Sequence, residues 1–266
     1  MQLLDIYIYP IKSLGGIRVE EANLEERGLQ YDRRWMLVDN QGDFLSQRKH
    51  PKMAMIQTNL SNNKIEVFLK NHVEENITIP FEPLSQEMIP VSIWDDEVIG
   101  QVVDRKINQW FSDILGFSCN LVHMPTSTER KVSSKYAAKN ESVSFADGMP
   151  YLLIGQASLN DLNNRLENPV PMDRFRPNLV LSGGHAFEED DWDKVKVGDA
   201  VFKITKPCAR CVMTTVDQTT GKKSKEPLKT LSTYREIEGK VLFGQNMSLL
   251  EGNKIKIGDY ISAYKK

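Results

Sequence analysis

One six-residue pattern occurs twice in the second half of the chain and limits the folds open to it. Lys194-Val195-Lys196-Val197-Gly198-Asp199 matches Lys254-Ile255-Lys256-Ile257-Gly258-Asp259, and an apolar strand is expected after each copy, at 201–204 and 260–264. Alternation of polar and apolar residues that ends in a glycine-containing turn is typical of a half-buried strand in a hairpin. Two similar hairpins favour a closed or nearly closed antiparallel barrel, and two copies are too few for a solenoid.

The first half of the chain is also typical of short strands between turns. Leu4, Ile6 and Ile8 alternate with polar or aromatic neighbours, which is the pattern of a strand with one buried face. Further strands are expected at 35–38, 55–60, 65–69 and 91–103, with turns at 39–42 and 61–63, and in the second half at 151–154 and 179–181. The sequence therefore predicts a mainly β protein with barrel-like domains and a few helices.

Two helices are predicted. Apolar residues from Ile107 to Leu115 recur at the spacing of one helical face, with Asp104 as a start signal and Gly116 as a stop signal. The segment Ser158-Leu159-Asn160-Asp161 resembles a capping box and predicts a second helix.

A polar stretch divides the two halves. Residues 125–148 are rich in Lys, Ser and Glu and lack sustained periodicity, which indicates a mobile loop or linker. The expected organisation is an N-terminal β-rich domain at 1–124, this linker, and a second β-rich domain at 149–266.

Composition excludes several classes of protein. The net charge of −2 gives no support to nucleic-acid binding, and no apolar run approaches the ~20 residues that a membrane helix needs. The N-terminus lacks the basic and apolar regions of a signal peptide, and three cysteines fit a reducing compartment, so we expect a cytoplasmic location with no membrane partner. Phosphate-loop, dinucleotide and serine-hydrolase motifs are also missing from the sequence.

The segment Cys208-Ala209-Arg210-Cys211 is the first candidate for chemistry. A zinc site would need a second ligand pair, and a redox dithiol would open a helix, whereas the residues at 212–216 are β-branched and strand-like. A single thiolate metal ligand is a third interpretation, since the neighbouring Arg210 favours the charged form of a thiol. From spacing alone, two plain structural cysteines explain the segment equally well.

Cationic side chains at turn-like positions are the second candidate. They are Lys12, Arg33, Arg34, Arg48, Arg174, Arg176 and Arg210, with the small polar residues Ser13, Asn178 and Thr214 close by in sequence. Arginine binds phosphate through two parallel hydrogen bonds, and lysine acts as a point charge. Together they predict a polyanionic ligand held between the two halves, although each residue taken alone is more typical of an ordinary surface charge.

Six segments together resemble the MOSC family, in the architecture that adds an N-terminal β-barrel domain. The segments are Tyr9–Ser13, Tyr31–Val38, Phe175–Val180, Cys208–Asp217, Lys225–Leu228 and Leu242–Asn246. The resemblance spans nearly the whole chain. The chain is similar to the branch of this family that contains the mitochondrial amidoxime-reducing component and bacterial relatives.

This resemblance implies a cofactor and a set of site residues. The cofactor would be a molybdopterin-type molybdenum cofactor, with Cys211 as the metal ligand and catalytic residue. Its phosphate and pterin would be surrounded by Lys12, Ser13, Arg33, Arg176, Asn178 and Arg210. A phosphorylated anion suits cations and polar donors, and a soft thiolate suits such a metal.

The resemblance also implies a reaction and partners. The family reduces small N-hydroxylated compounds such as amidoximes and hydroxylamines. Some bacterial relatives append a ferredoxin-like domain with the four cysteines of an iron–sulfur cluster. This sequence has only three cysteines, so a separate electron-transfer protein is expected. The alternative is a carrier that holds sulfur or the cofactor through Cys211 without turnover.

Overall fold

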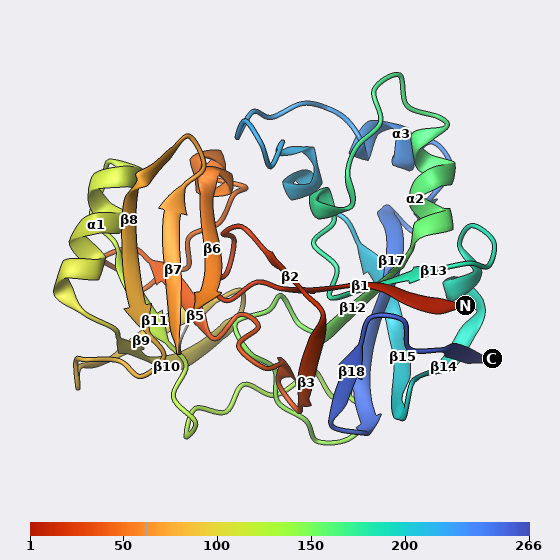
Figure 1. The fold of residues 1–266 in the computed structure, drawn as a ribbon, viewed down its shortest axis with the longest axis horizontal. Coiled ribbons are helices and arrows are strands. Elements are labelled where there is room, and N and C mark those ends of the chain that lie inside the picture. Colours follow the sequence, from red (N-terminus) through yellow and green to blue (C-terminus); the bar gives the residue numbers. More distant parts are fainter. Residues whose placement is uncertain (62) are drawn as a thin grey trace.

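A computed structural model describes residues 1–61 and 63–266, and its strands form two neighbouring bodies (Figure 1). The larger body is one nine-stranded sheet. Its order is β19 (Ile261–Lys265), β14 (Trp192–Val197), β15 (Ala200–Ala209), β17 (Lys240–Glu251), β12 (Tyr151–Gly155), β13 (Leu179–Ser182), β1 (Gln2–Ile8) and β2 (Ile17–Val19), with β16 (Glu236–Ile237) beside β17. The fold is therefore mainly β, which confirms the expected class.

This large sheet curls back on itself. Every pairing in it is antiparallel except that of β12 with β13. Gln2 of β1 bridges Tyr260, the residue directly before β19, so β1 is joined to both β13 and the opposite end of the sheet. The result is a nearly closed barrel, as expected, although only one of the two expected hairpins contributes to it.

The smaller body contains two further sheets and a helix. One sheet has the order β5 (Trp35–Val38), β11 (Asn120–His123), β10 (Asp96–Val102) and β9 (Met88–Ile93), and the other β6 (Ile56–Ser61), β7 (Lys64–Leu69) and β8 (His72–Pro80). Asn62, in the turn expected between β6 and β7, lies outside the described residues. A third sheet has the order β18 (Lys254–Lys256), β3 (Glu21–Glu25) and β4 (Gly28–Leu29), and packs Leu24, Leu29 and Ile255 into the core of the larger body.

The helices are short and lie outside the sheets. They are α1 (Arg105–Leu115), α2 (Gln156–Asn163) and α3 (Leu228–Ser232), with 3-10 turns at Pro51–Met55, Met172–Arg174, Glu188–Asp191 and Val212–Thr215. The first helix follows the prediction closely, because the Asp104 side chain accepts hydrogen bonds at its start and left-handed Gly116 ends it. Its buried face packs Ile107 and Phe111 into the same core as Leu121 of β11. No helix in the described part of the chain has the length and apolar character needed to cross a bilayer.

Two local predictions were wrong because of contacts that are made far away in the sequence. Leu4 is exposed while Leu3 is buried, because the β1–β13 register shifts between Leu3 and Asp5. Ser158 is no helix cap. The α2 helix begins before it, and its hydroxyl binds the buried Glu189 carboxylate instead.

The second copy of the repeated pattern is not a hairpin. The first copy pairs β14 with β15, as predicted. In the second copy, β18 pairs with β3 near the N-terminus and β19 pairs with β14.

The N-terminal strands cross the boundary expected at residue 124. Both β1 and β2 belong to the large sheet of the second half, so the sheets do not divide where the polar stretch does. Residues 125–148 contain no helix or strand, yet Phe145 is fully buried there and the Arg130 guanidinium donates to the carbonyls of Ser144 and Ala146. This loop therefore packs between the two bodies and carries side chains into their junction.

Candidate functional site

Six of the seven predicted site residues line one cavity at the junction of the two bodies. They are Lys12, Ser13, Arg33, Arg176, Asn178 and Arg210, and they come from four separate segments. The cavity has a volume of about 100 Å³. We call it the inner pocket.

The backbone of the inner pocket is unusual at three positions. Ser13, Arg33 and Arg176 have φ angles of 66°, 50° and 55°. Residues other than glycine seldom adopt this left-handed conformation, and where they do it is often beside a functional site. Here it lies at three of the positions whose side chains surround the cavity.

Two arginines share one aromatic ring at the base of the inner pocket. The Arg33 and Arg176 guanidinium carbons lie 4.3 and 4.2 Å from the centroid of the buried Tyr9 ring. Arg33 is neutralised by the fully buried Asp32 carboxylate at 2.7 Å. The Arg176 guanidinium makes no hydrogen bond or ion pair with residues 1–61 or 63–266, and burial lowers its pKa to about 10, with nearby Arg33 adding to the effect.

Two hydrogen bonds hold the Arg210 guanidinium in place, but one of its nitrogens has no hydrogen-bond partner among the described residues. Its guanidinium donates to the carbonyl oxygens of Phe243 at 2.7 Å and Phe175 at 3.0 Å. The remaining nitrogen, Nη2, is buried and has no partner within the described chain. A buried donor without a partner is costly unless a ligand supplies an acceptor.

Asn178 and Ser13 differ in what they leave free. The Asn178 amide is occupied, since it accepts from the Leu152 backbone at 3.2 Å and donates to the Tyr7 carbonyl at 3.2 Å. The Ser13 hydroxyl, by contrast, makes no hydrogen bond to any described residue and borders the cavity. The Asn178 side chain thus holds the wall of the pocket in place, and the Ser13 hydroxyl is a free donor for a ligand in the pocket.

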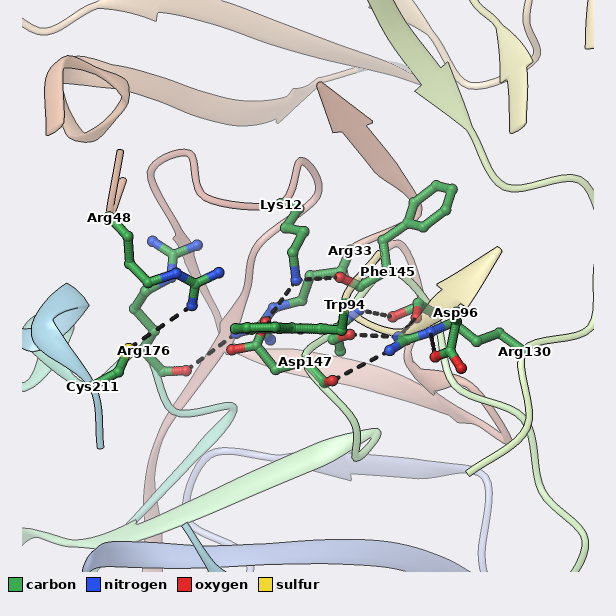
Figure 2. Close-up of polar contacts among 12 residues, drawn as sticks. Lys12, Arg33, Arg48, Trp94, Asp96, Arg130, Phe145, Asp147, Arg176 and Cys211 are labelled. Carbon is green, nitrogen blue, oxygen red and sulfur yellow. Dashed lines mark hydrogen bonds and ion pairs between the residues drawn. The ribbon is translucent and has the colours of Figure 1, made fainter. Parts of the chain in front are cut away.

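Lys12 also lines the inner pocket and pairs with Asp147 from the 125–148 loop. Its ammonium lies 2.7 Å from Asp147 Oδ1 and 2.8 Å from the Phe145 carbonyl oxygen (Figure 2). Burial lowers the pKa of Lys12 to about 8, although Asp147 opposes the shift. The Asp147 side chain is 58% exposed, and the nearby cations Lys12, Arg48 and Arg33 hold its pKa well below its usual range. At neutral pH both groups are therefore charged.

A larger cavity of about 550 Å³ adjoins the inner pocket and shares Arg48, Asp147 and Cys208 with it. We call it the outer cavity. Cys211 lines the outer cavity rather than the inner pocket, and its side chain is exposed. Arg48 points toward it, with Nη1 3.8 Å from Cys211 Sγ (Figure 2).

The two cysteines have different environments. Cys208 is half-buried, and burial raises the pKa of its thiol, although Arg210 opposes this. Cys211 follows the end of β15 and precedes a 3-10 turn at Val212–Thr215, so the strand expected at 212–216 was wrong. Both cysteines line the outer cavity, and the Cys211 sulfur is the more exposed of the two.

Some residues of the site were missed by the sequence analysis. Arg48 was only one of several candidate cations, and Trp94 and Asp147 were not considered at all. Trp94 donates to Asp147 Oδ1 at 3.3 Å, and Arg48 lies 4.2 Å from its ring centroid. A bulky residue in a two-residue turn between apolar strands was the signal for Trp94, whereas nothing local marked Asp147.

The charges of the site favour an anion. Five cationic side chains line the two cavities near their junction: Lys12, Arg33, Arg48, Arg176 and Arg210. Among the described residues, Asp147 is the one acidic side chain that lines the inner pocket, since Asp32 is buried behind Arg33, and Glu238 lines the outer cavity. Cations grouped against low-dielectric walls concentrate a positive potential, so the inner pocket fits an oxyanion such as a phosphate.

The fold and the site define a class of mainly β proteins. Members of this class have a cationic pocket between two bodies and an exposed cysteine beside it. Residues 1–118 match the MOSC N-terminal beta barrel domain and residues 140–262 match the MOSC domain. The chain belongs to the family of proteins that combine these two domains.

Known relatives match along most of the chain. Mitochondrial amidoxime-reducing component 1 of Mus musculus is 33% identical, over 96% of this chain and 79% of its own length. Mitochondrial amidoxime reducing component 2 of Rattus norvegicus is 35% identical, over 96% of this chain and 80% of its own length. Molybdenum cofactor sulfurase of Oryza sativa subsp. japonica is 34% identical over 92% of this chain, which spans 32% of that longer protein.

Proposed function

We propose that this protein is a molybdenum-cofactor-dependent reductase of small N-hydroxylated compounds. The observation that carries the proposal is the buried, unpartnered Arg210 Nη2 within a set of cations that ends beside Cys211. Similarity to two amidoxime-reducing components over most of their length supports the reaction.

The residues present fit a phosphorylated, thiolate-ligated cofactor. Arg210 Nη2 and the free guanidinium of Arg176 would hold its phosphate, with the Ser13 hydroxyl as a further donor. Lys12 and Arg33 would add positive charge around it. Cys211 would supply the sulfur ligand from the adjoining outer cavity.

The cofactor, when bound, supplies the two-electron chemistry that side chains cannot perform. The balanced reaction takes one amidoxime, two electrons and two protons to one amidine and one water, with cleavage of the N–O bond. The protein's own contribution is to bind and orient both partners. Lys12, with a pKa of about 8, is protonated at neutral pH and keeps the inner pocket cationic. The electrons are expected from a separate electron-transfer protein.

The proposal is tested by metal analysis and turnover. Protein purified from a host that makes the molybdenum cofactor should contain the metal and reduce benzamidoxime with an artificial electron donor. Protein from a cofactor-deficient host should do neither. Absence of molybdenum from the first preparation would refute the proposal.

Two observations favour a carrier as a second candidate. The Cys211 thiol is exposed, and the chain also matches a molybdenum cofactor sulfurase. A carrier would hold sulfur as a persulfide on Cys211, or hold the cofactor for delivery, without turnover. Steady benzamidoxime reduction would exclude a pure carrier, whereas a mass increase of one sulfur atom on Cys211, without turnover, would support it.

A further inference from the structure

The outer cavity has walls that the cofactor site does not explain. Its volume of about 550 Å³ lies in the range of sites for small organic ligands. Its apolar and aromatic lining comes from different parts of the chain and includes Trp94, Tyr136, Ile237 and Leu242. Because Cys211 lines the same cavity, a ligand bound against these walls lies close to the sulfur.

Trp94 occupies a backbone position that rarely suits it. It is the first residue of the two-residue turn between β9, which ends at Ile93, and β10, which begins at Asp96. Its φ is 58°, whereas Asp95 is not among the described residues with positive φ. Such turns strongly favour glycine at the first position, because a side chain there is strained.

The Trp94 ring is fixed in place but not covered. Its indole nitrogen donates to Asp147 Oδ1 at 3.3 Å, and the Arg48 guanidinium carbon lies 4.2 Å from the ring centroid. Phe44 contacts it with a centroid distance of 5.3 Å. Even so, 46% of Trp94 stays exposed. A strained turn that holds a large ring partly open to a cavity is better explained by binding than by packing.

Arg48 connects this ring to the reacting centre. The same guanidinium that stacks on Trp94 has Nη1 3.8 Å from Cys211 Sγ (Figure 2). Tyr136 provides another aromatic side chain in the cavity, with the Lys206 ammonium 3.9 Å from its ring centroid. Each of these two aromatic side chains is thus paired with a cation, and the Arg48 guanidinium contacts both the Trp94 ring and the Cys211 sulfur.

We propose that Trp94 is the specificity-determining residue of the outer cavity and selects N-hydroxylated substrates that carry a flat, conjugated ring. The substrate ring stacks on the exposed part of the indole, and its N-hydroxylated group extends toward Cys211. This inference rests on the proposed function for the identity of the reacting group. The ring selectivity itself depends only on Trp94 and the cavity.

Equilibrium binding separates ring selectivity from catalysis. Molybdenum-loaded protein without any reductant is titrated in a calorimeter with benzamidoxime and with its aliphatic analogue acetamidoxime. Trp94→Gly removes the ring and should raise the Kd of benzamidoxime about ten-fold, with little change for acetamidoxime. Trp94→Phe keeps an aromatic ring and should stay close to the wild type for both ligands.

A further variant tests the strain. Trp94→Ala also removes the ring but keeps a Cβ at positive φ, so it should lose benzamidoxime affinity like Trp94→Gly while unfolding at a lower temperature than that variant. Equal losses for both amidoximes in Trp94→Gly would indicate a structural role and overturn the inference, as would unchanged benzamidoxime affinity. If the protein lacks molybdenum and turnover, the proposed function fails, yet the benzamidoxime-to-acetamidoxime preference and its dependence on Trp94 can still be measured.

Discussion

Replacement of Lys12 by methionine should remove a specific part of the protein's pH dependence. Lys12 is 5% exposed, and burial lowers its pKa from 10.5 to about 8. Between these two values the unfolded chain keeps a proton that the folded chain has released. Stability therefore rises with pH across this window, because the unfolded state binds more protons there.

The expected magnitude follows from the size of the shift. A group with a pKa of about 8 in the folded state and 10.5 in the unfolded state adds about 2 to 3 kcal/mol to the free energy of unfolding between pH 7 and pH 10. Lys12→Met cannot contribute this increase. The difference between wild type and variant should therefore grow by that amount, whatever the variant's stability at pH 7.

Urea unfolding followed by tryptophan fluorescence at pH 7, 8, 9 and 10 measures this difference directly. Lys106→Met, which replaces an exposed lysine on α1, is the matched control and should run parallel to the wild type. If the wild-type and Lys12→Met curves stay parallel from pH 7 to pH 10, the buried, charged Lys12 described above is refuted.

Two further substitutions, together with one control, test the residues that surround the inner pocket. Gly244→Ala should destabilise the protein by more than about 2 kcal/mol, because its φ is 80° and a Cβ there would meet Ile154 Cγ1 at 2.6 Å. Gly116→Ala has a similar φ of 84° with nothing within 4 Å and should cost only about 1 kcal/mol, so equal costs in urea unfolding would contradict this explanation. Arg210→Met should weaken the calorimetric affinity for inorganic phosphate roughly ten- to hundred-fold, and an unchanged Kd would show that Nη2 does not meet the anion.

Local signals in the sequence predicted the elements that depend on local contacts. The α1 helix was placed correctly, because its cap, its periodic face and its terminal glycine all lie within 13 residues. Leu4 was misplaced, since the bulge that exposes it arises in pairing with β13, far away in the sequence. The second copy of the repeated pattern was misassigned for the same reason, because its β18 strand pairs with β3.

The candidate site divides in a similar way. Lys12, Arg33, Arg176 and Arg210 were proposed from residue type and resemblance, and the structure gathers them around one cavity. Asp147 could not be predicted, since its role depends on an ion pair with a lysine 135 residues earlier. Resemblance pointed to Cys211 over Cys208, whereas its exposure and its place in the outer cavity needed three-dimensional coordinates.

The central claim is that Cys211 is the single protein ligand of a molybdenum cofactor. The most direct measurement is the molybdenum content per chain of wild type, Cys208→Ala and Cys211→Ala, purified from the same cofactor-producing host. Wild type and Cys208→Ala should each hold about one molybdenum per chain, and folded Cys211→Ala should hold none, because only its thiolate is lost as a ligand. Full molybdenum content in Cys211→Ala, or its loss in Cys208→Ala alone, would contradict the claim.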